Sequence, residues 1–285
     1  MILRSLFLLL ALSVIACDTS PDADQAPEEL PRASESSRET GSTWEEREDF
    51  APFFKEADVE GSFLLYDQKQ NRYLAYNTAR CRTRFSPAST FKIFNSLVAL
   101  ETGVIKDENE VIPWDSVQRD IKEWNQDHTL RSGIKYSVVW LYQELARRVG
   151  HEKMQAYLDS AGYGNHTIGN KVDMFWLDGS LRISQEEQIA FLEKLHRNDL
   201  PFSRRSIDIV KDIMTLEETP QWIYRGKTGW ALRDSVNTGW FVGYLERGDD
   251  TWFFATNIEM DGNRTLPTRQ EITRKILQHL HLFEE

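Results

Sequence analysis

Strand-like segments stand at both ends of the folded part of this chain, and helix-like segments fill the stretch between them. Residues 62–68 and 72–77 are rich in aromatic and aliphatic side chains and flank a polar turn, a pattern that predicts a β-hairpin. Apolar spacing predicts that residues 104–216 are mostly helical and that a last helix covers 268–280. We therefore expect an α/β (α+β) fold in which helices flank one central antiparallel sheet and an all-helical lobe is inserted. The other predicted strands are Trp222–Lys227, Thr238–Leu245 and Thr251–Ile258, and the inner helices are Ser89–Glu101, Val138–Val149, Glu152–Ser160, Gln185–Arg197 and Arg204–Leu216.

The first 17 residues predict that the protein is exported. Arg4 precedes the apolar run Leu6–Ile15, which is too short for a permanent membrane span. The run leads directly into Cys17 and resembles the lipobox of bacterial lipoprotein signal peptides, so we expect cleavage before Cys17 and lipidation of its thiol. An ordinary signal peptide or a poorly cleaved anchor is the alternative. Residues 18–43 are rich in Pro, Ser and Glu and predict a disordered tether, followed by a catalytic domain at 44–285.

The net charge of −11 is concentrated near the N-terminus, where residues 18–49 hold eleven Asp or Glu against three Arg. The remainder is close to neutral and has no basic stripe, so no nucleic-acid partner is expected. Six His show no metal-ligand spacing, and no metal is expected. If Cys17 is lipidated, Cys81 has no intrachain partner, and we expect it to be a buried, unreactive thiol.

Three short motifs carry the chemistry: Ser89-Thr90-Phe91-Lys92, Ser137-Val138-Val139 and Lys227-Thr228-Gly229. Ser-x-x-Lys occurs about once by chance in such a chain, and a second copy at Ser132 contains Gly133 and precedes no apolar helix, so we reject it. Residues three apart on a helix share a face, and apolar neighbours lower the pKa of an amine. Lys92 can thus serve as the base for a Ser89 nucleophile. Together the motifs predict a serine acyl-transfer site that attacks β-lactams.

Each motif also has a structural alternative. Ser89 can cap a helix while Lys92 is solvated, and Ser137 can be the N-cap of the helix that follows it. Lys227-Thr228-Gly229 can be a surface strand with a turn, although its glycine also allows a substrate backbone to lie against the strand edge. A cleft between the sheet edge and the helical lobe would bring the three motifs together.

The motifs resemble those of the class D serine β-lactamases, the oxacillinase family. The likeness runs from about residue 50 to 282 and includes Tyr163-Gly164-Asn165, Phe175-Trp176-Leu177 and Thr268-Arg269-Gln270. The resemblance implies a serine β-lactamase/D,D-peptidase-like fold and hydrolysis of the β-lactam ring of penicillin-type antibiotics, which confers resistance. It implies no cofactor other than CO₂ or bicarbonate.

The resemblance implies a role for each matched residue. Lys92 would be N-carboxylated (N6-carboxylysine) as general base, held by the Trp176 indole, while Ser89 attacks the lactam carbonyl. Ser137 would relay a proton to the lactam nitrogen, and Lys227 would help to hold the substrate carboxylate. The substrate-binding residues would be Val139, Tyr163, Leu177, Thr228, Gly229, Trp230 and Arg269, with the Trp230 backbone N–H in the oxyanion hole.

Other functions remain as alternatives. A β-lactam sensor would acylate without turnover, a D,D-peptidase would act on the cell wall, and a non-catalytic lipoprotein would bind another protein. The expected partners are a small-molecule β-lactam and, through the lipid anchor, a membrane on the periplasmic side of a Gram-negative envelope. A monomer or a homodimer fits equally. The short connection that contains Arg233 resembles that of some carbapenem-hydrolysing members.

Overall fold

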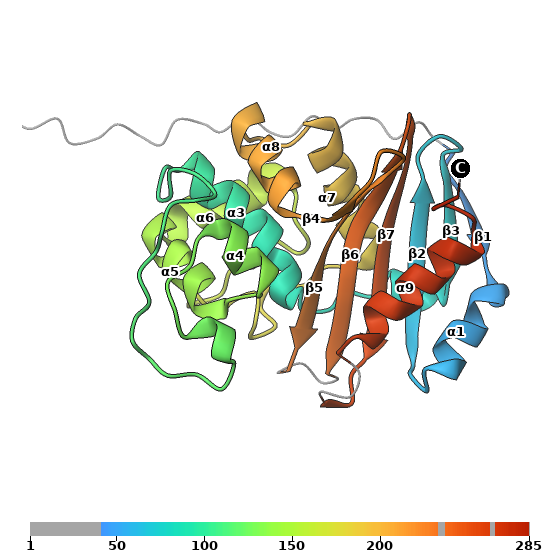
Figure 1. Cartoon of the computed structure of the whole chain (residues 1–285), viewed down its shortest axis with the longest axis horizontal. Coiled ribbons are helices and arrows are strands. Elements are labelled where there is room, and N and C mark those ends of the chain that lie inside the picture. The colour runs from blue at the N-terminus through green and yellow to red at the C-terminus, as the bar shows by residue number, and fades with distance from the viewer. Residues whose placement is uncertain (1–40, 233–236, 263–265, 285) are drawn as a thin grey trace, which may run out of the picture.

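The computed structural model describes residues 41–232, 237–262 and 266–284 (Figure 1). Within these residues a seven-stranded sheet has the strand order β1-β3-β2-β7-β6-β5-β4, so the early hairpin pairs with the late strands as expected. Four sequence predictions lie outside the described residues: the signal peptide, lipidation at Cys17, residues 18–40 of the predicted tether, and Arg233. The strands are β1 (Thr43–Glu46), β2 (Gly61–Asp67), β3 (Arg72–Tyr76), β4 (Thr215–Glu218), β5 (Ile223–Ala231), β6 (Thr238–Arg247) and β7 (Asp250–Glu259).

The sheet is mixed, which corrects the expectation of a purely antiparallel sheet. β1 runs parallel to β3, with Thr43 opposite Arg72, whereas the other neighbours pair antiparallel. The chain passes through α1 (Ala51–Glu56) and β2 before β3, and so enters β3 in the direction of β1. Trp44 stacks on Tyr73 with ring centroids 4.7 Å apart, and this contact holds the edge strand β1 in place. No local sequence pattern predicts a contact between residues so far apart in the chain.

The middle of the chain is helical only in part. Much of 102–129 is irregular because Asp107 and Asp115 accept hydrogen bonds from nearby backbone N–H groups, which competes with helix formation. The predicted helix from Arg204 stops at Ile213, since Thr215–Glu218 pairs with β5 as a strand. The longer helices are α3 (Lys92–Glu101), α5 (Val139–Val149), α6 (His151–Ala161), α7 (Gln185–Arg197), α8 (Arg204–Ile213) and α9 (Thr268–His279), and the short ones are η1 (Glu48–Phe50), α2 (Thr78–Cys81), η2 (Ala88–Phe91), η3 (Lys122–Trp124) and α4 (Leu130–Lys135).

The two faces of the sheet bury two separate cores, because successive strand residues point to opposite sides. Leu64, Val242 and Ala255 belong to the core shared with α7 and the helical lobe. Phe241 and Phe254 belong to the core beneath α1 and α9, the layer in front of the sheet in Figure 1. The central strands are therefore held from both sides. This rigid sheet carries one wall of the site.

α3 crosses the interior of the helical lobe. All its residues from Lys92 to Leu100 are buried, and it packs against α5, α8 and η2. Cys81 is also buried, as expected, and burial raises the pKa of its thiol to about 12. Over the described parts of the chain, no helix has both the length and the apolar character to cross a bilayer.

Candidate active site

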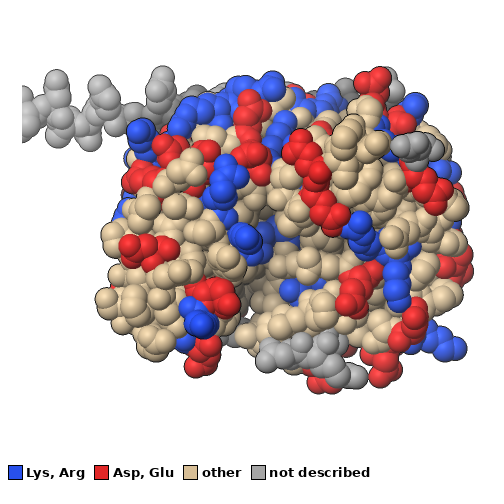
Figure 2. Space-filling model, viewed as in Figure 1, with Lys and Arg blue, Asp and Glu red and all other residues tan. Residues whose placement is uncertain are grey.

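The three motifs meet at one cavity between the helical lobe and the edge of β5. Its volume is about 840 Å³, and the surface is hollowed between the lobe and the sheet in Figure 2. η2, which carries Ser89, packs against β5 and β6. The lining residues are Ser89, Ile121, Trp124, Tyr136, Ser137, Val139, Gln143, Met174, Leu177, Thr228, Gly229, Trp230, Leu232, Leu266 and Arg269.

Ser89 and Lys92 form the predicted pair. The Lys92 Nζ donates a hydrogen bond to the Ser89 Oγ at 2.8 Å, and the Lys92 side chain is buried. Burial, and secondly the charge of Lys227, hold the pKa of Lys92 well below that of a free lysine. A neutral amine beside a hydroxyl can accept its proton, which is the arrangement that an activated serine requires.

The turn before the nucleophile is strained and tightly held. Ala88 has a φ of 47°, in the left-handed region that side chains with a Cβ seldom adopt. Its N–H donates to the Trp176 carbonyl at 3.0 Å, and the Ser86 hydroxyl donates to the same oxygen at 2.9 Å. These bonds fix the segment that presents Ser89, at the N-terminal end of the lobe's central helix.

Gly229 allows β5 to approach this turn. A Cβ at this position would lie 2.9 Å from the Pro87 carbonyl oxygen and 3.1 Å from the Thr90 Cγ2. The sequence suggested that the glycine makes room for a substrate backbone. In the structure its first effect is on the protein itself, since any larger residue would push the strand away from Ser89.

Ser137 lies between α4 and α5 and is not an N-cap, so that alternative is wrong. α5 begins at Val139 with Val138 as its N-cap, and Ser137 has a φ of 56°. The Ser137 N–H reaches the Ile134 carbonyl at 3.3 Å, and the Val138 N–H reaches the Gly133 carbonyl at 2.9 Å. This pair of bonds is a Schellman motif, which ends α4 with Ser137 in the left-handed position that glycine usually fills.

Lys227 joins Ser137 to β5. Its Nζ donates to the Ser137 Oγ at 3.0 Å and to the Thr228 carbonyl at 2.9 Å. The rejected Ser-x-x-Lys copy is elsewhere: Ser132 forms a capping box with Thr129 at the start of α4 and does not line the cavity.

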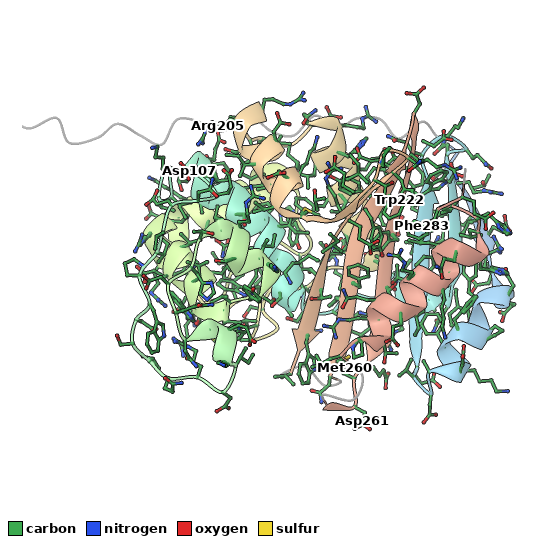
Figure 3. All side chains as sticks on the ribbon, viewed as in Figure 1. Asp107, Arg205, Trp222, Met260, Asp261 and Phe283 are labelled. Atoms are coloured by element: carbon green, nitrogen blue, oxygen red, sulfur yellow. The ribbon has the colours of Figure 1, made fainter. Side chains whose placement is uncertain are left out.

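Three basic side chains, those of Lys92, Lys227 and Arg269, lie at the site, and Arg269 keeps its charge at neutral pH. Burial, and secondly the Arg269 charge, lower the pKa of Lys227 to about 7, and burial lowers the pKa of Arg269 to about 10. Arg269 is buried and points a guanidinium nitrogen at the Met260 sulfur, 3.7 Å away, beyond the end of β7 where Figure 3 labels Met260. Among the described lining residues none is a carboxylate, so an anionic ligand would supply the missing countercharge.

Trp176 is fully buried beneath the nucleophile turn. Its ring stacks on Phe91 with centroids 5.3 Å apart, and its indole N–H has no hydrogen-bond partner within the described structure. A buried donor without a partner is costly, so it marks a place where an acceptor is missing. Val139 and Leu177 contribute apolar surface to the cavity.

Tyr163 is not brought to the cavity. Its ring is buried among Phe91, Phe94 and Phe191, and it is absent from the lining. Aromatic packing draws this side chain into the core of the lobe, so its predicted contact with substrate stays a prediction that the cavity lining does not support.

Several cavity residues were not foreseen from the sequence. Ile121, in the irregular segment of the lobe, and Leu232, just after β5, both line the cavity with 45% and 59% of their surface exposed. Trp124, Tyr136, Met174 and other apolar residues complete the wall. No local signal identifies them, because the irregular segment that carries Ile121 and Trp124 reaches the site only through its fold.

Comparison with known proteins decides the family. The model for the penicillin binding protein transpeptidase domain matches residues 61–278. The chain is 45% identical over 235 residues to the β-lactamase OXA-48 of Klebsiella pneumoniae. The matched region covers 82% of this chain and 89% of that protein. The chain belongs to the class D β-lactamases. The class D β-lactamase YbXI from Nostoc shares its fold with a TM-score of 0.80 and 48% identity, over 81% of this chain and 98% of that chain.

A sensor domain is related as well. The C-terminal domain of the BlaR penicillin receptor of Bacillus licheniformis has a TM-score of 0.80 and 37% identity, over 84% of this chain and 97% of that chain. The predicted family, fold class and enzyme activity are confirmed, apart from the direction of β1: this class D β-lactamase is a β-lactam hydrolase. Across the described residues, no cluster of three or more His, Cys, Asp or Glu side chains is arranged to hold a metal ion.

Proposed function

We propose that this class D β-lactamase opens penicillin-type lactam rings through an acyl-enzyme on Ser89, with N-carboxylated Lys92 as general base. The observation that carries the proposal is the buried Lys92 amine, 2.8 Å from the Ser89 hydroxyl and with a strongly lowered pKa. An ordinary ammonium could neither accept the serine proton nor react with CO₂.

The remaining steps follow from the neighbours of this pair. The Ser89 Oγ attacks the lactam carbonyl, and the backbone N–H groups of Ser89 and Trp230 receive the oxyanion. The Ser137 hydroxyl donates a proton to the lactam nitrogen as the ring opens, and Lys227, bonded to it at 3.0 Å, restores that proton. Arg269 and Thr228, which line the same cavity, bind the substrate carboxylate.

The surroundings of Lys92 fit a carboxylated side chain. When present, the added carboxylate would supply a general base for acylation and deacylation. Trp176 offers a buried indole N–H that lacks an acceptor, and Val139 and Leu177 limit the access of water. The apolar side chains favour the neutral Lys92 amine, which is the form that reacts with CO₂. The indole N–H then favours the carboxylated side chain, because that anion can accept its hydrogen bond.

The test is turnover of ampicillin with and without added bicarbonate, combined with ¹³C NMR of protein equilibrated with ¹³C-bicarbonate. We expect many turnovers, activation by bicarbonate, and a carbamate resonance that disappears in Lys92→Ala. Trp176→Phe should weaken the resonance and slow deacylation, whereas Trp222→Phe serves as a matched control. The Trp222 ring packs on the Phe283 ring with centroids 5.0 Å apart, on the far side of the sheet from the lobe (Figure 3). A resonance of full intensity in Trp176→Phe would remove Trp176 from this role.

The likeness to the BlaR receptor domain supports a second candidate, a sensor that is acylated and not released. The same assay separates the two functions. A single stoichiometric burst without further turnover would indicate a sensor, and Ser89→Ala should abolish covalent labelling by a fluorescent penicillin in either case.

We further propose that the protein is a lipoprotein anchored through Cys17 on the periplasmic side of a Gram-negative envelope, where it protects the cell from β-lactams. The support is the run Val14-Ile15-Ala16-Cys17 and the acidic, Pro- and Ser-rich segment after it. Cys17→Ser should leave activity intact and release the protein from the membrane fraction. If the variant remains membrane-bound, lipidation at Cys17 is wrong.

A further inference from the structure

Ser137 needs support that its own turn does not fully provide. It occupies the left-handed position of a Schellman motif with a φ of 56°, where a non-glycine residue is disfavoured. Its amide bond to Ile134 is 3.3 Å long. A small rotation of the Tyr136–Ser137 peptide would move the hydroxyl away from Lys227, so something must hold that peptide.

The Trp124 side chain holds the Tyr136–Ser137 peptide by a hydrogen bond. Its indole N–H donates to the Tyr136 carbonyl at 3.0 Å, and the carbonyl of Tyr136 is part of the peptide that leads into Ser137. Trp124 and Ser137 both line the cavity. Because one backbone oxygen is fixed by this bond, the peptide plane and the direction of the Ser137 side chain are fixed with it.

Trp124 is itself anchored by two further contacts. The Trp140 indole N–H in α5 donates to the Trp124 carbonyl at 2.8 Å. The buried His128 ring lies 2.8 Å from the Glu123 carbonyl and 2.9 Å from the Ser132 hydroxyl in the capping box of α4. The segment around Trp124 is therefore tied to both ends of α4 and to α5, the two helices that flank Ser137.

We propose that Trp124 is a positioning residue that acts through Ser137, and that His128 and Trp140 keep it in place. The inference rests on the proton-donor role proposed for Ser137. It predicts that the Trp124 N–H matters for the ring-opening step and hardly at all for deacylation, in which Ser137 has no proposed part.

Trp124→Phe removes the N–H and keeps an aromatic ring in the wall. We expect kcat/KM for benzylpenicillin to fall about fivefold to tenfold, the equivalent in rate of one neutral hydrogen bond, with the deacylation rate little changed. Trp114→Phe is the matched control, since the Trp114 indole donates to the Val117 carbonyl at 3.2 Å on the same segment but does not line the cavity. Trp140→Phe tests the anchor independently and should give a smaller loss in the same step.

Two comparisons separate positioning from loss of wall contact. In a Ser137→Ala background, Trp124→Phe should have no further effect, because its target hydroxyl is already absent. The loss should also be equal for 6-aminopenicillanic acid, which has no acyl side chain to touch the wall. Three outcomes would overturn the inference and leave the proposed role of Ser137 intact. They are full additivity of Trp124→Phe with Ser137→Ala, an unchanged kcat/KM in Trp124→Phe, and a loss restricted to benzylpenicillin. A Ser137→Ala variant with full activity would overturn the role proposed for Ser137, and the inference with it.

Discussion

Lys227 is a buried amine whose surroundings predict how the stability of the protein depends on pH. Burial and the nearby Arg269 charge lower its pKa from 10.5 to about 7. Between about pH 7 and 10.5 the unfolded chain holds a proton that the folded chain has released, so the free energy of unfolding rises with pH across this window. From pH 6 to pH 9 this single group contributes about 3 kcal/mol to the rise.

Lys227→Met removes the titrating group and keeps the apolar stem. We expect the variant to be more stable than the parent at pH 6, where the parent contains a buried ammonium, and the gap to narrow by about 3 kcal/mol at pH 9. Urea unfolding followed by tryptophan fluorescence, in bicarbonate-free buffer at both pH values, measures this difference. Bicarbonate should reduce the effect, since a negative charge on Lys92 would favour the Lys227 ammonium.

Lys275→Met is the matched control for this experiment. Lys275 lies at the surface, where its Nζ pairs with Glu56 at 3.0 Å, and its removal should shift both unfolding curves by a similar small amount. If the gap between Lys227→Met and the parent stays constant from pH 6 to pH 9, Lys227 has an ordinary pKa. Water would then reach the amine, and its proposed return of a proton to Ser137 at neutral pH would lose its physical basis.

Three further outcomes are expected. Gly229→Ala places a Cβ 2.9 Å from the Pro87 carbonyl oxygen and should cost about 1–3 kcal/mol of stability and about tenfold or more in kcat/KM, measured by urea unfolding and nitrocefin turnover. Normal activity would show that β5 can retreat without harm. Ala88→Gly should stabilise the protein by about 1 kcal/mol in thermal unfolding, because glycine adopts a φ of 47° without strain. It should also slow acylation, because the turn before Ser89 becomes looser. An unchanged stability would show that Ala88 is not strained. In a Cys17→Ser protein, Cys81 should react with Ellman's reagent only after unfolding, since burial raises its pKa to about 12, and rapid labelling of the folded protein would disprove this.

Elements whose limits are written in local sequence were predicted well. α7 was predicted with the bounds that it has, because Ser184 and Glu187 form a capping box at its start and Asn198 adopts the left-handed conformation that ends it. The β2–β3 hairpin is confirmed for a similar reason, since its turn is local.

Features that depend on distant contacts could not be predicted. The direction of β1 depends on where Trp44 finds Tyr73. The burial of Tyr163 depends on aromatic rings from three other elements, although its motif suggested contact with substrate. Trp124 gave no local signal at all, because its importance comes from one backbone carbonyl twelve positions later. The reactive residues could be found because each motif combines reactive side chains at a short, fixed spacing in the sequence. The residues that orient them are distant in sequence and reach them only in the folded protein.

Four unfavourable features of this molecule meet at the cavity. Ala88 and Ser137 are non-glycine residues in the left-handed region, and the Lys92 and Lys227 amines are buried with lowered pKa values. Each feature opposes folding, yet each also sets the position or protonation state of a reacting group. The double-sided packing of the sheet offsets their cost. Substitutions that relax these positions should therefore stabilise the fold and weaken catalysis together, whereas substitutions in the two cores should lower stability first and affect activity only through it.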